Sequence, residues 1–314
     1  MKMKKGKNIT YIRKLQKMII NASGRTDICA FYSEWFINRI KEGYLDVRNP
    51  FYKNLVSRII LDPKNIDLIV FCTKNPIPML KYLSYLKNYN LLFQITITPY
   101  LKEIENNVPN KKRIIESIKY LSKELGKERI FLRYDPIFMN KKYNLEYHTK
   151  MFDKILNILD GYIDRVIISF IDFKKNTTYN KKILNTNELN IDEIKQVAVK
   201  FSKIAQKYNI KIQTCAEKYD LLEYGFINEG CLSPSTYFKL TGKTNIKKSK
   251  NRKYCKCIET VDIGVYNTCL HFCKYCYANF KEEDVLKNKS LHDSNSSLLI
   301  GYLKPEDKIT RRKK

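Results

Sequence analysis

Residues 68–76 read LIVFCTKNP: five apolar residues, then a short polar segment that ends in proline. A continuous apolar run of this length, closed by turn residues, predicts a strand that is buried on both faces. A helix is expected next, over 79–86, before another apolar run begins at Leu91. This order of buried strand, polar strand end and helix predicts one βα unit of a parallel sheet.

The same pattern occurs six times between Met18 and Cys215. Strands are expected at 18–22, 68–72, 91–96, 130–134, 166–170 and 210–215, and helices at 33–42, 79–86, 111–125, 145–159 and 191–208. This regularity predicts an α/β fold, with a TIM-type barrel or partial barrel of about six βα units. A doubly wound open sheet is the alternative. Its first strand would normally precede a glycine-rich phosphate loop, and SGRTD at 23–27 is not one.

Composition divides the chain into four parts. We expect a basic extension over 1–17, the βα repeats over 18–218, a cysteine-rich region over 219–284 that packs on the mouth of the barrel, and a polar tail over 285–314. Within these parts, a polar loop is expected at 174–187, a helix at 219–226 and a short strand at 259–265.

The composition excludes several classes of protein. Hydrophobic residues make up 44% of the chain, which is enough for a sizeable core. No apolar run is long enough to span a membrane, and the N-terminal residues lack the apolar centre and cleavage site of a signal peptide. We therefore expect a cytoplasmic protein. Nine cysteines there argue against a disulfide scaffold, and the clustering of seven of them between Cys215 and Cys276 favours metal ligation.

The formal net charge is +27, and lysine far outnumbers arginine. Such a surface attracts polyanions and acidic proteins, so nucleic acid is one partner that the charge suggests. The alternative is a solvated lysine surface with no specific partner.

Cys269, Cys273 and Cys276 lie within eight residues, in the spacing C-x3-C-x2-C, with Tyr275 just before the third. Three thiolates this close suit a 4Fe–4S cubane and leave one iron without a protein ligand. Zinc is the alternative, because Cys273 and Cys276 form a C-x2-C pair and the C-x-C pair at 255–257 could supply a second pair of ligands. The x3 spacing is not needed for zinc and favours the cubane.

Four more cysteines form a second candidate set: Cys215, Cys231, Cys255 and Cys257. Four thiolates would saturate a second 4Fe–4S cluster. The alternative is that one or two of them are buried core thiols. Cys29 and Cys72 stand apart from both sets and are expected to be inert. His271, inside the cysteine loop, is a conceivable ligand but is expected to be a surface residue or to lie next to the ligands.

The pattern C-x3-C-x-aromatic-C at 269–276 resembles the signature of radical S-adenosylmethionine enzymes. The resemblance implies that the three cysteines hold a 4Fe–4S cluster and that the open iron binds S-adenosylmethionine. One electron would then cleave this cofactor to methionine and a 5′-deoxyadenosyl radical, with Tyr275 lying against the adenine. The basic surface would suit docking of an acidic electron donor such as flavodoxin or ferredoxin.

A larger part of the chain, from Met18 onward, resembles an uncharacterised bacterial family, DUF1848. Four stretches carry this resemblance: INASGRTDI at 20–28, TKNP at 73–76, RYDPI at 133–137 and DIGVYNTC at 262–269. The RxDPI motif is also similar to a segment of spore photoproduct lyase, a radical enzyme that repairs DNA.

Typical radical S-adenosylmethionine enzymes carry the cysteine loop after the first strand, whereas here it follows six βα units. A circular permutation would account for this order, because it would place the strand at 259–265 beside the strand at 18–22. The turn at 23–27 would then stand where relatives contact the amino group of the cofactor.

The candidates for cofactor binding are polar or aromatic residues at the strand ends and in the cysteine loop. They are Tyr275, Ser23, Gly24, Arg25, Asp27, Arg133, Asp135 and Glu217. The arginines could pair with the cofactor carboxylate, and the acids could bind its amino or ribose groups. Ion pairs within the barrel mouth are the alternative for each of them.

The sequence thus predicts a radical S-adenosylmethionine enzyme with one 4Fe–4S cluster, or with two, and it does not identify the substrate. The alternative is a basic nucleic-acid-binding protein whose C-terminal cysteines hold structural zinc.

Overall fold

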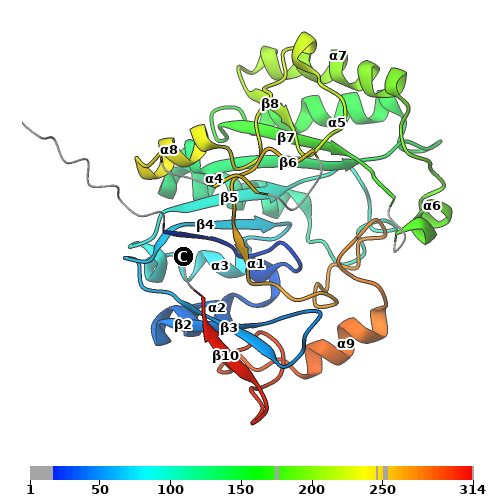
Figure 1. Ribbon diagram of the computed structural model, residues 1–314. Coiled ribbons are helices and arrows are strands. Elements are labelled where there is room, and N and C mark those ends of the chain that lie inside the picture. The colour runs from blue at the N-terminus through cyan, green and yellow to red at the C-terminus, as the bar shows by residue number, and fades with distance from the viewer. Residues whose placement is uncertain (1–16, 174–176, 245–246, 250–253, 313–314) are drawn as a thin grey trace, which may run out of the picture.

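The computed structural model describes residues 17–173, 177–244, 247–249 and 254–312. The expected basic extension, apart from Lys17, lies outside these residues. The central sheet contains β1 (Met18–Asn21), β4 (Ile66–Thr73), β5 (Leu91–Thr96), β6 (Ile130–Ile137), β7 (Arg165–Phe170), β8 (Lys211–Thr214) and β9 (Val261–Asp262). Its order is β8-β7-β6-β5-β4-β1-β9, and all neighbouring strands are parallel (Figure 1). The α/β class and all six expected strands are confirmed.

The helices expected between these strands are present, with small changes at their ends. They are α2 (Ser33–Glu42), α4 (Lys111–Leu125), α5 (Leu145–Ile158) and α7 (Ile191–Lys207). The helix expected at 79–86 is instead broken into α3 (Ile77–Leu80) and the 3₁₀ turn η1 (Leu83–Leu86). Gly43 ends α2 in the left-handed conformation, with a φ of 80° that other residues rarely adopt.

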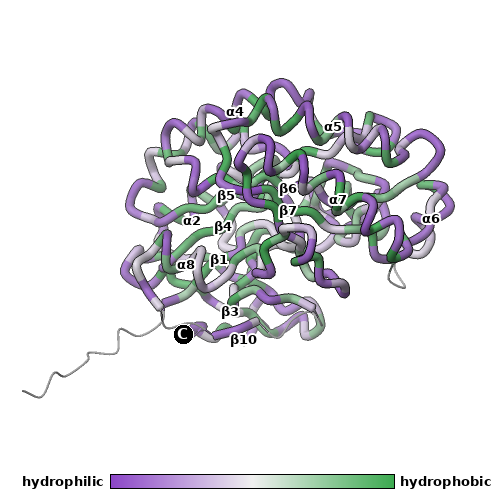
Figure 2. The backbone as a smooth tube through the Cα atoms, turned by 90° about the horizontal axis from the view of Figure 1, so that it is seen from above, coloured by the Kyte–Doolittle hydropathy of each residue, from purple (hydrophilic) through white to green (hydrophobic). Residues whose placement is uncertain are grey.

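Strands β1, β4, β5, β6, β7 and β8 follow one another across the sheet in chain order. Because βα crossovers are right-handed, an order that never reverses places the connecting helices on one face, which disfavours the doubly wound alternative. Figure 2 shows α4 and α5 along one side of β5, β6 and β7. The sheet is open: in the part of the chain that the structure describes, no ladder joins β8 to β9.

Irregular chain spans the side between these two edge strands. The amide of Ile227 donates to the Ile212 carbonyl of the β8 edge at 2.8 Å. Farther along, the amide of Ile258 donates to the Leu232 carbonyl at 3.0 Å. Residues 227–232 and 256–258 therefore occupy the place where further strands would close a barrel.

Strand β9 lies beside β1, as the permuted order predicts. Ile20 pairs with Val261 and Asn21 with Asp262. The strand is shorter than the expected 259–265, but it enters the sheet at the expected position. The cysteine loop that follows therefore begins next to the turn after β1.

The two faces of the sheet are covered differently. One face packs against the helices in the main core, with Phe71, Phe93 and Tyr134 pointing toward them. The other face, here called the inner face, packs its apolar residues against α8 (Pro234–Thr241). Most of these residues come from the first halves of their strands, and Val70 follows just after the middle of β4: Ile19, Leu68, Val70, Leu92, Phe131 and Ile167. Helix α8 thus covers the beginning of the strands and leaves their carboxyl ends to the loops.

Some elements were not expected from the sequence. Strands β2 (Tyr44–Arg48), β3 (Leu55–Ile60) and β10 (Lys308–Arg311) form a second sheet, below the first in Figure 1. Two short helices, α6 (Thr178–Leu184) and α9 (Glu282–Ser290), lie in the expected loop and across the start of the expected tail. The tail is held against α2, because Trp35 Nε1 donates to the Ser296 carbonyl at 2.9 Å.

The remaining elements are short: α1 (Ile28–Phe31), η2 (Lys127–Arg129) and η3 (Leu222–Tyr224). The helix expected at 219–226 is reduced to η3. Among the described residues, no helix is both long and apolar enough to cross a membrane.

Candidate metal centre at the carboxyl ends of the strands

The three cysteines that follow β9 are carried on one short loop beside the turn after β1. Burial raises the pKa of Cys269 well above its usual value, and the charges of Cys276, Asp27 and Cys273 raise it further. Burial likewise raises the pKa of Cys273 to about 12, although nearby Lys74 opposes the change. All three cysteines are free. The charges of neighbouring cysteines contribute to both shifts, so the three thiols lie within electrostatic range of one another.

The loop is clamped between two other segments. The turn after β1 holds it from one side, since Thr268 Oγ1 donates to Thr26 Oγ1 at 2.7 Å. The segment after β5 holds it from the other side, where the side chain and the backbone amide of Asn107 donate to the carbonyls of Leu270 and His271 at 2.9 and 3.1 Å. The thiols are therefore carried on a fixed backbone.

Asp27 organises this clamp. One carboxylate oxygen accepts from the amide of Ala30 at 3.0 Å, which caps α1, and from Thr73 Oγ1 at 2.7 Å. The other oxygen accepts from the amide of Lys74 at 2.8 Å and from His271 Nε2 at 3.0 Å. With only 4% of its surface exposed, Asp27 uses both oxygens within the protein. These four contacts give Asp27 a structural role, which is the alternative to cofactor binding.

Glu105, which the sequence did not single out, lies at the centre of a charged network beside Cys273. It accepts hydrogen bonds from Lys74 at 2.8 Å, from Thr98 at 2.6 Å and from the hydroxyl of Tyr275. Burial alone would raise the pKa of Glu105, but the charges of Lys74 and Lys111 outweigh it and lower the pKa to about 2. Lys74 Nζ also lies 5.4 Å from the centre of the Tyr275 ring. No motif marks Glu105, because it lies in an irregular segment after β5.

The turn after β1 is tied to β9. Arg25 Nε lies 3.1 Å from Asp262 Oδ2 in an ion pair. Gly24 lies so close to Asp262 that a Cβ there would stand 2.4 Å from the same oxygen. Ser23 Oγ accepts from the amide of Ile28 at 3.3 Å, so the side chains of this turn serve the local structure.

A second polar group lies at the ends of β6 and β8. Arg133 Nη1 donates to Gln94 Oε1 at 2.8 Å, and Arg133 Nε donates to Asp135 at 3.1 Å. Burial first, and then the charges of Asp172 and Asp135, raise the pKa of Glu217 to about 7. Glu217 follows Ala216, which has a φ of 56°, a strained conformation for a residue with a side chain. A carboxylate that titrates near neutral pH at a strand end is typical of a functional site.

The second set of cysteines is also brought together. The Sγ atoms of Cys231 and Cys257 are 3.3 Å apart. Cys231 raises the pKa of the Cys215 thiol, and Cys231 and Cys255 both raise the pKa of Cys257. Contrary to expectation, Cys72 does not stand apart: it packs with Cys215 and Cys231 on the inner face, and its thiol donates to Gln94 Oε1 at 3.8 Å.

Neither set is arranged around a single ion. Across residues 17–173, 177–244, 247–249 and 254–312, no three His, Cys, Asp or Glu side chains converge on one point where a metal ion would bind. Ligands of a cubane need not converge in this way, because each thiolate binds a different iron atom.

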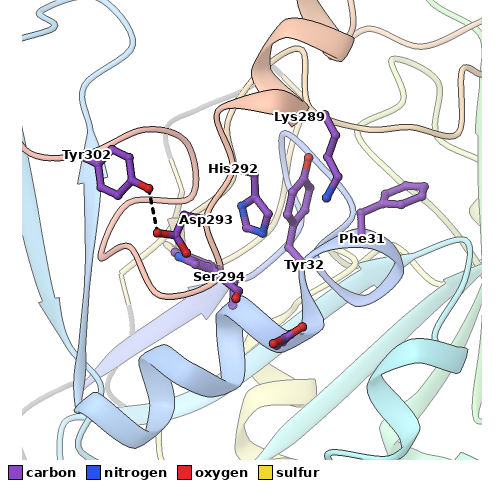
Figure 3. Close-up of a pocket in the computed structure, with 9 residues that line it drawn as sticks. Phe31, Tyr32, Lys289, His292, Asp293, Ser294 and Tyr302 are labelled. Carbon is purple, nitrogen blue, oxygen red and sulfur yellow. Dashed lines mark hydrogen bonds between the residues drawn. The ribbon is translucent and has the colours of Figure 1, made fainter.

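A surface cavity of about 540 Å³ lies between the α1–α2 segment and the chain from the end of α9 onward (Figure 3). Its lining includes Phe31, Tyr32, Lys289, His292, Asp293 and Tyr302. The ring of Phe31 lies 4.6 Å from the ring of His271, and the Tyr32 hydroxyl donates to the Thr268 carbonyl at 2.7 Å. No cysteine lines the cavity, so it borders the thiol site without including it.

A sequence model of the DUF1848 family, a domain of unknown function, matches residues 19–278. The chain belongs to the DUF1848 family. The matched region runs from β1 through the loop at 269–276, so both cysteine sets lie within the DUF1848 domain. The resemblance to this family is confirmed, while the likeness to radical S-adenosylmethionine enzymes stays a prediction.

No curated protein matches this DUF1848 chain. Among solved structures, a putative alpha-L-fucosidase from Bacteroides thetaiotaomicron is similar over 66% of this chain and 77% of that chain, with 11% identity and a TM-score of 0.25. This likeness is too weak to indicate an activity.

The donor set of the loop fits an iron–sulfur cluster. Three partly buried thiols without disulfide partners lie on one loop, and Lys74 brings positive charge beside Cys273 and Cys276. Buried polar atoms normally have partners, yet in the described structure His271 Nδ1 and Asn279 Oδ1 have none. Both atoms belong to the cysteine loop or its end, where a bound group would change their surroundings.

Proposed function

We propose that this DUF1848 protein is a radical S-adenosylmethionine enzyme in which Cys269, Cys273 and Cys276 hold a 4Fe–4S cluster. The observation that carries the proposal is the C-x3-C-x2-C spacing of these three thiols on a loop that follows β9 and lies beside the carboxyl end of β1. Proteins with parallel sheets bind their ligands at this end of the strands. The singly wound sheet supports a partial barrel of the kind that such an enzyme would use.

A cluster held in this way supplies an open iron for S-adenosylmethionine and the electron that cleaves it. The protein side chains would prepare the site. Lys74 places an ammonium group beside Cys273 and Cys276 and offsets the charge of their thiolates. Glu105 holds Lys74 and the Tyr275 hydroxyl in place, and we assign Tyr275 to contact with the adenine.

The remaining cofactor candidates divide into two groups. Arg25 and Asp27 act as positioning residues, because the first joins the turn after β1 to β9 and the second fixes His271 within the cysteine loop. Arg133, Asp135 and Glu217 are the groups that we assign to the cofactor or the substrate, since they gather at the ends of β6 and β8.

The electron is proposed to come from an acidic protein such as flavodoxin or ferredoxin. A net charge of +27 favours encounter with a negatively charged partner. Nucleic acid would be attracted by the same charge and is therefore a candidate substrate class.

The decisive experiment uses protein purified and reconstituted without oxygen. We expect bound iron and sulfide, and cleavage of S-adenosylmethionine to 5′-deoxyadenosine and methionine when dithionite is added. Replacing Cys269, Cys273 and Cys276 by alanine should abolish the cleavage. Reconstituted protein that holds iron but cleaves no S-adenosylmethionine would overturn the proposal. Colourless protein that contains zinc instead of iron would favour the alternative of a nucleic-acid-binding protein.

A further inference from the structure

Two thiols from separate segments of the chain are in contact on the open side of the sheet, between β8 and β9. Cys231 lies in the segment before α8, and Cys257 lies in the segment before β9. Their Sγ atoms are 3.3 Å apart, and neither cysteine is in a disulfide. Because a disulfide joins two sulfur atoms at about 2.0 Å, a small movement would bring the pair to bonding distance. Both residues are only partly buried, so a small reagent can reach them.

The backbone on both sides of this contact is held in place. The carbonyl of Cys231 accepts from Gln94 Nε2 at 2.9 Å, which ties its segment to β5. The residues that follow the two cysteines are joined directly, because the amide of Ile258 donates to the Leu232 carbonyl at 3.0 Å. The approach of the two thiols is therefore set by the packing of their segments.

Gly230 allows the close approach of these two segments. A Cβ at this position would lie 2.5 Å from the amide nitrogen of Cys257 and 2.6 Å from the carbonyl oxygen of Lys256. Both neighbours are backbone atoms, which cannot move away as a flexible side chain could. Only glycine lets the segment of Cys231 approach the segment of Cys257 this closely.

A buried cation lies near the pair. Burial opposes the charge of Arg133, but the charges of Asp135, Cys215 and Cys231 outweigh it and raise the pKa of this guanidinium well above its usual value. Arg133 is therefore charged and lies within electrostatic range of Cys231. A neighbouring arginine favours the thiolate form of a cysteine, which is the form that attacks a disulfide.

We propose that Cys231 and Cys257 are a redox-active pair, which a low-molecular-weight disulfide converts from two thiols into one protein disulfide. The Cys231 thiolate attacks one sulfur of the small disulfide, whose S–S bond breaks and releases one small thiol. The Cys257 thiolate then attacks Cys231 in the mixed disulfide, forms the Cys231–Cys257 bond and releases the second small thiol. The two cysteines are oxidised, the small disulfide is reduced to two thiols, and the two cysteine protons pass to those thiols.

The new bond would cross-link the open side of the sheet. The segment that carries Cys231 is attached to the β8 edge, because the Ile227 amide donates to the Ile212 carbonyl at 2.8 Å. The segment that carries Cys257 leads into β9 and then into the cysteine loop. A disulfide stabilises a protein mainly by restricting its unfolded chain, so we expect the oxidised form to melt about 5–10 °C higher than the reduced form.

The test uses full-length protein in which Cys269, Cys273 and Cys276 are replaced by alanine, so that the loop thiols cannot react. This leaves one cysteine in each of the two tryptic peptides that matter, 219–239 and 257–274. The protein is treated with oxidised glutathione, and its remaining thiols are then alkylated. Mass spectrometry should find the two peptides joined, and dithiothreitol should separate them. Wild-type protein should show the same junction and the same reversible rise in melting temperature.

Single substitutions in the loop-deficient protein locate the pair. Cys231→Ser and Cys257→Ser should each abolish the cross-link and the rise in melting temperature. Cys72→Ser is the matched control, because it removes a neighbouring thiol that packs with Cys231 on the inner face. This variant should keep both effects.

Three results would overturn the proposal. The first is thiols that stay reduced, or stop at a glutathione adduct, in excess oxidised glutathione. The second is a disulfide that joins Cys231 to Cys215, or Cys257 to Cys255. The third is zinc or iron bound by Cys231 and Cys257 in the loop-deficient protein as isolated. The outcome is separate from that of the proposed function, because a cross-link in the loop-deficient variant would stand whether or not wild-type protein cleaves S-adenosylmethionine.

Discussion

The substitution Glu105→Gln tests whether the charge network beside the cysteine loop stabilises the folded protein. Glu105 is 2% exposed and lies 2.8 Å from Lys74 and 3.3 Å from Lys111. Glutamine keeps the size and shape of the side chain but removes its charge. Lys74, which is itself buried, would then lose its ion-pair partner.

Two routes give the same magnitude for this change. Removing one partner of a buried ion pair typically costs about 3–5 kcal/mol. Independently, lowering the pKa of Glu105 from 4.5 to about 2 corresponds to about 3 kcal/mol of stability at neutral pH. We therefore expect Glu105→Gln to lower the free energy of unfolding by about 3 kcal/mol at pH 7.

The pH dependence has a definite sign. The folded protein lowers the pKa of this carboxyl, so the stabilisation is fully present above the unfolded value near 4.5 and is lost as the pH falls toward about 2. Wild-type protein should lose stability faster than the variant over this range, and the two unfolding curves should converge. Urea unfolding followed by circular dichroism at several pH values measures both effects.

Glu103→Gln is the matched control. This carboxylate lies two residues earlier, pairs with Lys142 and also has its pKa lowered to about 2, but it is 48% exposed. Solvent screens such pairs, so we expect a loss of about 0.5 kcal/mol. Equal losses for the two variants, or a Glu105→Gln deficit that persists unchanged at acid pH, would refute the reasoning.

Three further predictions concern the strand ends. Burial raises the pKa of Glu217 to about 7, so the folded protein loses stability as the pH rises from about 4.5 to 7. Glu217→Gln should remove this loss. Urea unfolding should therefore show the variant to be more stable than wild type at pH 8 but not at pH 4. Gly24→Ala would place a Cβ 2.4 Å from Asp262 Oδ2 and should cost about 2 kcal/mol, measured by thermal unfolding, and an unchanged melting temperature would contradict the close approach. Asp27→Asn should weaken the bond to His271 and lower the iron content of the reconstituted loop, and full retention of iron would show that the loop holds its position without Asp27.

The sequence was informative where apolar runs and glycines follow simple rules. The strands at 91–96 and the helices at 33–42 and 111–125 have the predicted bounds, because buried parallel strands are continuously apolar and because Gly43 and Gly126 end their helices. The hairpin of β2 and β3 was missed. Its strands mix charged and apolar residues, and β10, which pairs with β3, lies about 250 residues away in the chain.

The site could be predicted in part, for a similar reason. The spacing of the cysteines marks both candidate sets in the sequence, and in the structure Cys231 Sγ and Cys257 Sγ lie 3.3 Å apart. Metal binding by either set stays a prediction. Glu105 and the proximity of Cys72 to Cys231 depend on which face of a strand or loop points inward. That direction is set by tertiary packing, which local sequence does not encode.

The late position of the cysteine loop in the chain has a physical explanation in the sheet. Strand β9 needs only two paired residues to enter beside β1, because Arg25 and the small Gly24 dock against Asp262 and fix the junction from the other side. In a parallel sheet, every strand delivers its following loop to the same edge, whatever its place in the sequence. The loop after β9 can therefore lie beside β1. Asp27 connects the two parts of the chain there, because its carboxylate binds α1, the end of β4 and His271. If this junction is what positions the thiols, weakening it by Gly24→Ala should reduce the iron content of the reconstituted loop.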